Sequence, residues 1–191
     1  MDKWAHLGHA LGECWIDNNK NIAFVHIPKN ASSFVKGCLL STGKFTHSSS
    51  LVQADRYLVT LRDPLERWIS GITQFMSNPI NQHLTIEQLT DRWTFDDHTE
   101  LQTYFLKGID LEQCDFIRVD DNLRTNIKSW MAVNGYYVTD IDQIPNINTG
   151  DHQAQKQYAN ILDFDQDLVL KLTEHYAKDY ELINRVKFYG T

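Results

Sequence analysis

Near its start the chain reads Ile22-Ala23-Phe24-Val25-His26-Ile27-Pro28-Lys29-Asn30-Ala31-Ser32-Ser33-Phe34-Val35. A short apolar run leads into a Pro-Lys pair and then into small and hydroxyl-bearing residues, after which apolar residues recur with helical spacing up to Leu40. This order predicts a buried strand, a tight loop and a helix. A helix N-terminus presents backbone N–H groups without intrahelical partners and a partial positive charge, so the loop is suited to bind phosphate or sulfate.

Three side chains of this loop are also suited to an anion. Lys29 adds a full positive charge, and Ser32 and Ser33 add hydroxyl donors. The loop lacks the glycine-rich sequence ending in Lys-Ser/Thr that is typical of ATP-binding loops. The alternative is an ordinary strand and helix whose Lys29 lies in solvent.

The 191 residues are expected to form one domain, residues 1–191, in which residues 1–20 make an N-terminal arm. The formal net charge of −7 and the lack of a basic run argue against nucleic acid as a partner. No apolar run approaches the roughly 20 residues that span a bilayer, and no secretory signal is visible. We therefore expect a cytoplasmic or otherwise soluble protein. Its three cysteines are too few and too scattered for a disulfide framework or a zinc site.

A second motif reads Leu61-Arg62-Asp63-Pro64-Leu65-Glu66-Arg67-Trp68-Ile69-Ser70-Gly71. Arg62 follows a predicted strand, at the edge where open α/β sheets bind ligands, and Ser70 lies two turns into the next predicted helix. A guanidinium and a hydroxyl so placed could hold a second phosphate. The alternative is a surface pair between Arg62 and Asp63 or Glu66, which would contribute little.

Predicted strands alternate with predicted helices along the chain. This alternation favours parallel strands joined by crossover helices, hence an α/β fold in which a central, mainly parallel sheet lies between helical layers in a three-layer sandwich. The predicted strands are 22–27, 56–61 and 115–119, and the predicted helices are 30–40, 64–76, 85–93, 97–107, 122–133, 153–160 and 166–189.

The two motifs, in this order, resemble the paired signatures of sulfotransferases that use 3′-phosphoadenosine 5′-phosphosulfate (PAPS). The branch they resemble is the membrane-associated carbohydrate type of sulfotransferase family 2, which includes the heparan sulfate and chondroitin O-sulfotransferases. The resemblance implies a P-loop-NTPase-like sulfotransferase fold. It also implies that Arg62 and Ser70 hold the 3′-phosphate. The 5′ end would lie in the first motif, on Pro28, Lys29, Asn30, Ala31, Ser32 and Ser33, although the family more often has threonine or serine where this chain has Asn30.

Further similarity is sparser. Residues 97–102 and 115–117 resemble the family's histidine-glutamine segment and third strand, and residues 176–182 resemble its C-terminal tyrosine-aspartate helix. Asn148, Thr149 and Lys156 resemble the loop that caps the cofactor, so the resemblance implies that they bind it.

The implied reaction is an in-line displacement at sulfur that releases 3′-phosphoadenosine 5′-phosphate (PAP) and needs no metal. Lys29 would stabilise the leaving phosphate, since positioning and charge stabilisation dominate such transfers. The resemblance makes His47 the first candidate for the base. His98 is the second candidate, with Asp97 or Glu100 near enough in sequence to orient it. Each histidine has a surface role as its alternative, and His26, on a buried strand, is interpreted as structural.

The acceptor is expected to be a hydroxyl-bearing glycan or small molecule, and the acidic chain argues against a long polyanionic one. An ATP-dependent phosphotransferase of related fold and a non-catalytic nucleotide- or glycan-binding module are the alternative functions.

Overall fold

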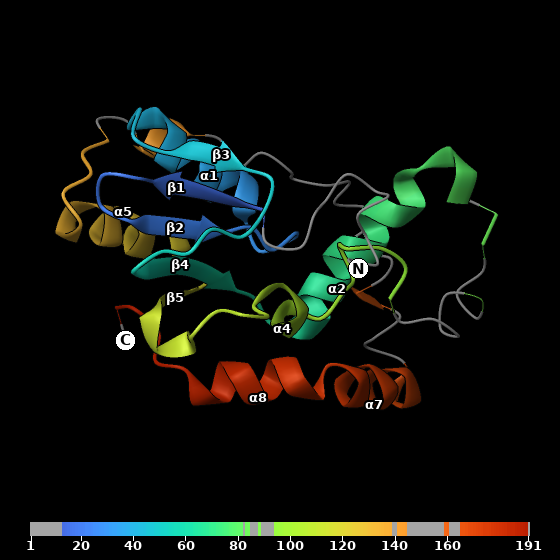
Figure 1. Ribbon diagram of the computed structural model, residues 1–191. Helices are drawn as coiled ribbons and strands as arrows, with labels where there is room; N and C mark the ends of the chain where they lie inside the picture. Colours follow the sequence, from blue (N-terminus) through green and yellow to red (C-terminus); the bar gives the residue numbers. More distant parts are fainter. Residues whose placement is uncertain are drawn as a thin grey trace.

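The computed structural model describes residues 13–81, 83–84, 88, 94–138, 141–144, 159–160 and 165–190. Its sheet has five strands in the order β3-β1-β2-β4-β5 (Figure 1). β1 is antiparallel to both of its neighbours, whereas β2, β4 and β5 are parallel, so β1 runs against the other four strands. The strands are β1 Cys14–Asp17, β2 Ile22–Val25, β3 Thr46–Ser48, β4 Arg56–Leu61 and β5 Cys114–Arg118.

The predicted α/β class is confirmed, and four of the five strands run in one direction, but two of the four strand pairings are antiparallel, so the sheet is mixed. The three predicted strands are present and mutually parallel, but β1 and β3 join them through antiparallel pairings. Of the N-terminal arm predicted over residues 1–20, the structure describes residues 13–20, and there the four residues of β1 are all buried in the sheet. Trp15 pairs with Phe24 across the β1–β2 hairpin, whose turn contains Asn21 in the left-handed region (φ 52°).

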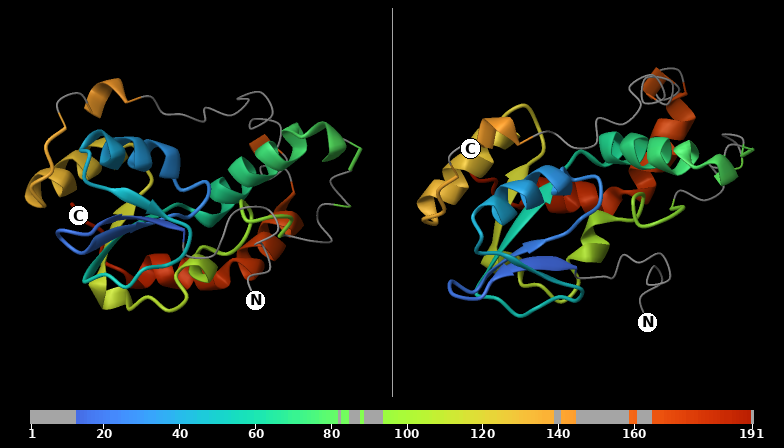
Figure 2. Two further views of the ribbon diagram at one scale, coloured as in Figure 1. Left: turned by 45° about the horizontal axis from the view of Figure 1, so that its top comes forward. Right: turned by 90° about the horizontal axis from the view of Figure 1, so that it is seen from above.

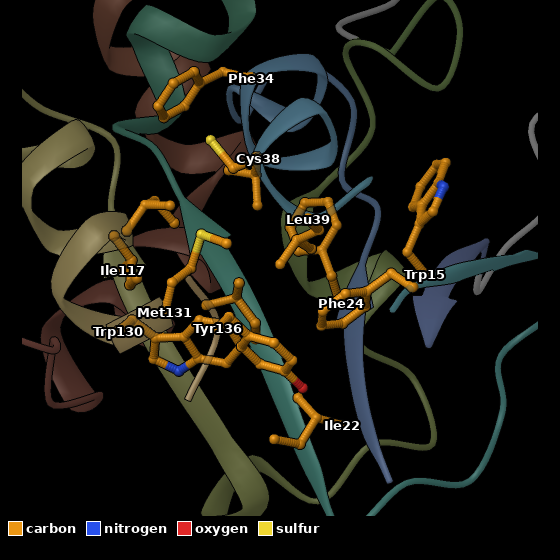
Figure 3. Close-up of a cluster of buried hydrophobic side chains, with 14 of the residues drawn as sticks. Trp15, Ile22, Phe24, Phe34, Cys38, Leu39, Ile117, Trp130, Met131 and Tyr136 are labelled. Atoms are coloured by element: carbon orange, nitrogen blue, oxygen red, sulfur yellow. The ribbon is translucent and has the colours of Figure 1, made fainter. Parts of the chain in front are cut away.

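Helices cover both faces of the sheet (Figures 1 and 2). On one face, α1 (Ser32–Ser41) and α5 (Leu123–Val133) pack against Phe24, Leu58 and Ile117. Figure 3 shows this cluster, in which side chains of α1 and α5 meet over the strands. On the other face, α4 (Gln102–Phe105) and α8 (Ala177–Arg185) pack against neighbouring strand positions. The same strands contribute to the clusters on both faces, because a strand has a two-residue period that places successive side chains on opposite faces of the sheet.

α2 (Pro64–Ser77) carries the second motif away from β4 and confirms the helix predicted over residues 64–76. The Asp63 carboxylate caps it by accepting from the N–H groups of Leu65 and Glu66, and Pro64 occupies the first turn, where its missing N–H costs nothing. Its apolar face packs on α7 (Gln166–His175), which Figure 1 places beside α8. The described residues also include short 3-10 helices at Pro79–Asn81, Leu111–Gln113 and Ile141–Gln143.

Two predicted helices differ from the structure. The single helix expected over residues 166–189 is divided into α7 and α8 at Tyr176, whose buried hydroxyl donates to the carbonyl of Thr99. Of residues 97–107, only α4 is helical; residues 94–101 form turns instead. The helices predicted over 85–93 and 153–160 lie almost wholly outside the described residues. Within the described ranges, no helix combines the length and apolar character needed to cross a membrane.

Candidate functional site

A cavity of about 680 Å³ lies where the β2–α1 loop meets the end of β4, the middle of α2 and the turn at residue 98. We call it the main cavity. It brings both sequence motifs together, because parallel strands β2 and β4 are neighbours and end at the same edge of the sheet. The predicted site residues that line it are Pro28, Lys29, Ala31, Ser32, Ser33, Arg62, Ser70 and His98. The predicted capping residues Asn148, Thr149 and Lys156 lie outside the described part of the chain.

The loop that enters α1 has the backbone of an anion cradle. Lys29 and Ala31 both adopt the left-handed region, with φ values of 68° and 57°. Such conformations are costly for residues with a Cβ atom and concentrate at ligand-binding sites. Ala31 gives α1 no side-chain cap, and no acidic residue lies in the first turn. The first-turn N–H groups of α1 are therefore not neutralised by a side-chain carboxylate of the helix itself.

The side chain of Asn30, which was predicted to bind the cofactor, has a structural position away from the main cavity. It is fully buried, and its Nδ2 donates to the carbonyl of Thr60 at 2.6 Å and to Oε1 of Gln102 at 2.7 Å. The Thr60 hydroxyl in turn donates to the carbonyl of Asn30 at 2.8 Å. An amide can make these bonds because it carries two donors, so Asn30 fastens the loop to β4 rather than facing the cavity.

Gln102 joins the two motifs. Besides accepting from Asn30, its Oε1 accepts from the N–H of Arg62 at 3.0 Å, and its Nε2 donates to the Arg62 carbonyl at 2.9 Å. Buried Asp179 of α8 accepts from the N–H groups of Gln102 and Thr103 at 2.8 and 3.0 Å. The resemblance singled out the segments that contain Gln102 and Asp179 but did not assign these bridging contacts, which depend on the tertiary arrangement.

Arg67 fixes the turn that carries His98, and the sequence analysis missed it. The side chain is 1% exposed, and its guanidinium donates to the carbonyls of Pro28 at 2.9 Å, Asp97 at 3.2 Å and Glu100. Burial lowers its pKa against the attraction of nearby acidic groups. This explains why residues 97–101 do not continue a helix: two of their carbonyls bind Arg67.

Lys29 and His98 are connected through one amide. Lys29 Nζ donates to Oε1 of Gln74, and Nε2 of Gln74 lies 3.1 Å from Nε2 of His98. Burial lowers the pKa of Lys29 to about 8, opposed by Asp96 and assisted by Arg62. These three side chains form a continuous path along the wall of the main cavity.

His98 is held by two carboxylates. Its Nδ1 lies 3.1 Å from Oδ2 of Asp96 and 3.1 Å from Oδ1 of Asp97. Burial acts to lower its pKa, but the hydrogen bonds and charges of the two aspartates outweigh burial and raise it to about 9. These residues also offer ligand atoms within 4.8 Å of one another, which makes them the described group best placed for a metal ion. A proton on Nδ1 of His98, hydrogen-bonded to the two carboxylates, also accounts for the arrangement of these three residues and requires no metal ion.

His47, the first candidate for the base, does not line the main cavity. It lies on β3 with its side chain half exposed, and its Nε2 is 3.1 Å from Oε1 of Glu13. The histidine that does line the cavity beside the loop is His26, whose Nε2 lies 3.0 Å from Oγ of Ser32. Its Nδ1 lies 2.9 Å from Oε2 of Glu13. The sequence interpretation of His26 as merely structural overlooked this position.

Arg62 lines the main cavity and also makes the pair with Glu66 that the sequence offered as its alternative role. Its Nε makes the predicted pair with Glu66 at 3.3 Å, and its Nη1 approaches the carbonyl of Lys29 at 3.5 Å. Lys36 adds a third cation to the lining, and none of the lining residues that the structure describes is acidic. The main cavity is therefore positive in a chain whose formal net charge is −7.

Comparison with protein-family models, curated proteins and solved structures found no match to this chain. The arrangement itself gathers the N-terminus of α1, the side chains of Lys29 and Arg62, and a histidine oriented by two carboxylates, His98, around one cavity.

Proposed function

We propose that this protein is a sulfotransferase that moves the sulfuryl group of PAPS to a hydroxyl of a carbohydrate acceptor. One observation carries the proposal: Lys29, Ser32 and Ser33 from the first motif share a cavity with Arg62 and Ser70 from the second. Two anion positions about one cavity suit an adenosine that carries substituents at both its 3′ and 5′ positions. The proposal includes the P-loop-NTPase-like variant of the α/β fold that the sequence resemblance implies.

In this proposal, each of the two motifs binds one end of the cofactor. The N-terminus of α1, with Ser32 and Ser33, holds the 5′-phosphosulfate, and Arg62 with Ser70 holds the 3′-phosphate. The cavity lining also includes three apolar side chains suited to contact a nucleobase, those of Phe34, Val119 and Leu123.

In the proposed reaction an acceptor oxygen forms a bond to sulfur while the bond from sulfur to the 5′-phosphate oxygen breaks. Lys29 stabilises the charge that develops on the leaving oxygen. His98 accepts the acceptor's proton at Nε2, because Asp96 and Asp97 hold the other ring nitrogen. His98 takes this role in place of His47, since His98 lines the cavity and His47 does not.

An ATP-dependent phosphotransferase and a non-catalytic binding module are the competing proposals. The first is disfavoured by the lack of a Gly-Lys-Ser/Thr loop in the first motif. The second is disfavoured by the buried Asp-Asp-His cluster beside Lys29, which binding alone would not require.

Calorimetry with PAP and with ATP separates these proposals. We expect PAP to bind at least tenfold more tightly than ATP, because ATP has no 3′-phosphate to pair with Arg62. A preference for ATP would contradict the sulfotransferase proposal. Transfer of labelled sulfate from PAPS to a panel of neutral and anionic glycans then tests catalysis, and binding of PAP without any turnover would support the non-catalytic module.

A further inference from the structure

Three side chains form a hydrogen-bonded chain into the main cavity. Oε2 of Glu13 lies 2.9 Å from Nδ1 of His26, and Nε2 of His26 lies 3.0 Å from Oγ of Ser32, the first residue of α1. The backbone fixes the first pair, because the N–H of His26 donates to the carbonyl of Glu13 at 3.0 Å beside the β1–β2 ladder. Neither Glu13 nor His26 has a role in the transfer described above.

The positions of the protons follow from the chemistry of these groups. The hydrogen bond from His26 holds the pKa of Glu13 below its ordinary value despite burial, so Glu13 is a carboxylate and can only accept. Nδ1 of His26 must then carry a proton. In a neutral imidazole this leaves Nε2 as an acceptor, and Ser32 has to donate its single hydroxyl proton to it. In this state Ser32 offers the cavity only lone pairs.

A phosphate or sulfate group reverses this requirement, because its oxygens need donors. If Ser32 turns its proton toward the anion, its oxygen faces the lone pair of Nε2, and two acceptors oppose each other across 3.0 Å. A proton on Nε2 removes the conflict. The imidazolium then donates to Ser32, Ser32 donates to the anion, and Glu13 stabilises the new positive charge.

We propose that binding of a phosphate or sulfate monoester at the N-terminus of α1 is coupled to uptake of one proton by His26. His26 is thus a positioning residue that turns the Ser32 hydroxyl into a donor. The proposed function enters only in naming the anion as the 5′ end of the cofactor.

The surroundings of His26 favour this coupling. The cations on the cavity wall, Lys29, Lys36 and Arg62, disfavour a further positive charge while no anion is bound. The Trp15 ring packs edge-on against His26 with centroids 5.5 Å apart and carries no charge. Among the described residues, His47 is also nearby, and its Nε2 lies 3.1 Å from Oε1, the other carboxylate oxygen of Glu13.

The test measures proton uptake by calorimetry with two probes, PAP and inorganic phosphate, in buffers that differ in ionisation enthalpy. Lys29 and His98 also titrate near pH 8 and 9, so the informative quantity is the difference between the native chain and His26→Gln. Where His26 is neutral in the free protein, we expect the native chain to take up about one proton more than His26→Gln. The affinity of the native chain should then fall by an additional factor of about ten for each pH unit, compared with the affinity of His26→Gln. His47→Gln, the matched control, should keep the native uptake.

The outcomes separate this inference from the proposed function. PAP binding with equal proton uptake in the native chain and His26→Gln would overturn the inference and leave the function standing. Binding of phosphate but not PAP, with uptake that depends on His26, would do the opposite, and binding of neither probe would overturn both. If His26→Gln does not fold, Ser32→Ala replaces it, because removing the hydroxyl should abolish the same proton uptake.

Discussion

At the residue scale, the Gln74 amide determines which protonation states of Lys29 and His98 fit together. An amide has one acceptor oxygen and one donor nitrogen. With Oε1 accepting from Lys29, the nitrogen of Gln74 donates toward Nε2 of His98, which must then be unprotonated. This pairing, a charged lysine and a neutral histidine, is the one that the proposed transfer needs.

The rate of transfer is therefore expected to depend on pH as a bell. Transfer needs a neutral His98, whose pKa is about 9, together with a charged Lys29, whose pKa is about 8. Because the two pKa values lie in this order, the active combination is a minor species at every pH, and the rate rises with pH below about 8 and falls above about 9. The maximum should lie midway between these values, at about pH 8.5, because each value limits one side of the bell. Initial rates of labelled-sulfate transfer between pH 6.5 and 10.5 check this.

The variant His98→Asn tests whether His98 is the base that causes the fall in rate on the acid side of the pH profile. It should lower the rate by about 10²-fold or more and remove the fall in rate on the acid side. A slow variant that keeps the acid limb would show that another group accepts the proton.

Lys29 and Arg62 are the two cations that we propose bind the cofactor, and removing each one should have a different effect. Lys29→Ala is expected to lower turnover by about 10²–10³-fold, as for other groups that stabilise a developing negative charge. Arg62→Ala should instead abolish the preference for PAP over adenosine 5′-phosphate, since it removes the partner of the 3′-phosphate. Lys44→Ala, on an exposed turn away from the cavity, is the control. If both variants behave like this control, the main cavity is not the active site.

At the element scale, the sequence predicted the elements whose patterns are local. The three parallel strands and α2 were predicted closely, and their order was sufficient to bring Lys29 and Arg62 to one sheet edge. β1 was missed because four residues beside a glycine-rich segment give no periodic signal. With β1 missed, Glu13 could not be recognised as the cross-strand partner of His26. The non-helical turn at residues 97–101 depends on Arg67, a contact between distant segments that no local pattern encodes.

The packing of α2 on the turn at His98 requires a glycine at position 71. A Cβ atom there would lie 2.7 Å from the carbonyl oxygen of His98 and 2.8 Å from Cγ2 of Thr99. Gly71→Ala should therefore destabilise the protein by about 1–3 kcal/mol and displace His98. Denaturant unfolding and the transfer rate should both reveal the change.

Gly37→Ala in α1 is the matched control for this variant. Its added Cβ would lie 3.1 Å from the end of the Ile144 side chain, which can move aside, and alanine favours a helix by about 1 kcal/mol over glycine. We expect its stability to stay near that of the native chain. Equal stability and activity of the two variants would contradict the tight packing of α2 on the His98 turn.

At the scale of the whole molecule, the distribution of charge favours binding of a small anionic cofactor and disfavours binding of a long anionic acceptor. The formal net charge is −7, yet the described lining of the main cavity has cations and no acidic residue. A small anion can enter the cavity and meet Lys29, Lys36 and Arg62 directly. A long polyanion must also lie along the outer surface, where the excess of acidic residues repels it.

Cofactor binding and use of a polyanionic acceptor are therefore expected to respond to salt in opposite directions. The Debye length, over which salt screens the interaction between charges, shortens from about 30 Å at 0.01 M salt to about 8 Å at 0.15 M. PAP should bind more weakly as salt rises, because its attraction to the cavity cations is screened. With PAPS kept saturating, the KM for heparan sulfate should fall over the same range, because its repulsion by the acidic surface is screened, while the KM for a neutral oligosaccharide stays constant. Steady-state rates across a salt series measure both constants, and a KM for heparan sulfate that is low and rises with salt would instead reveal a basic acceptor groove.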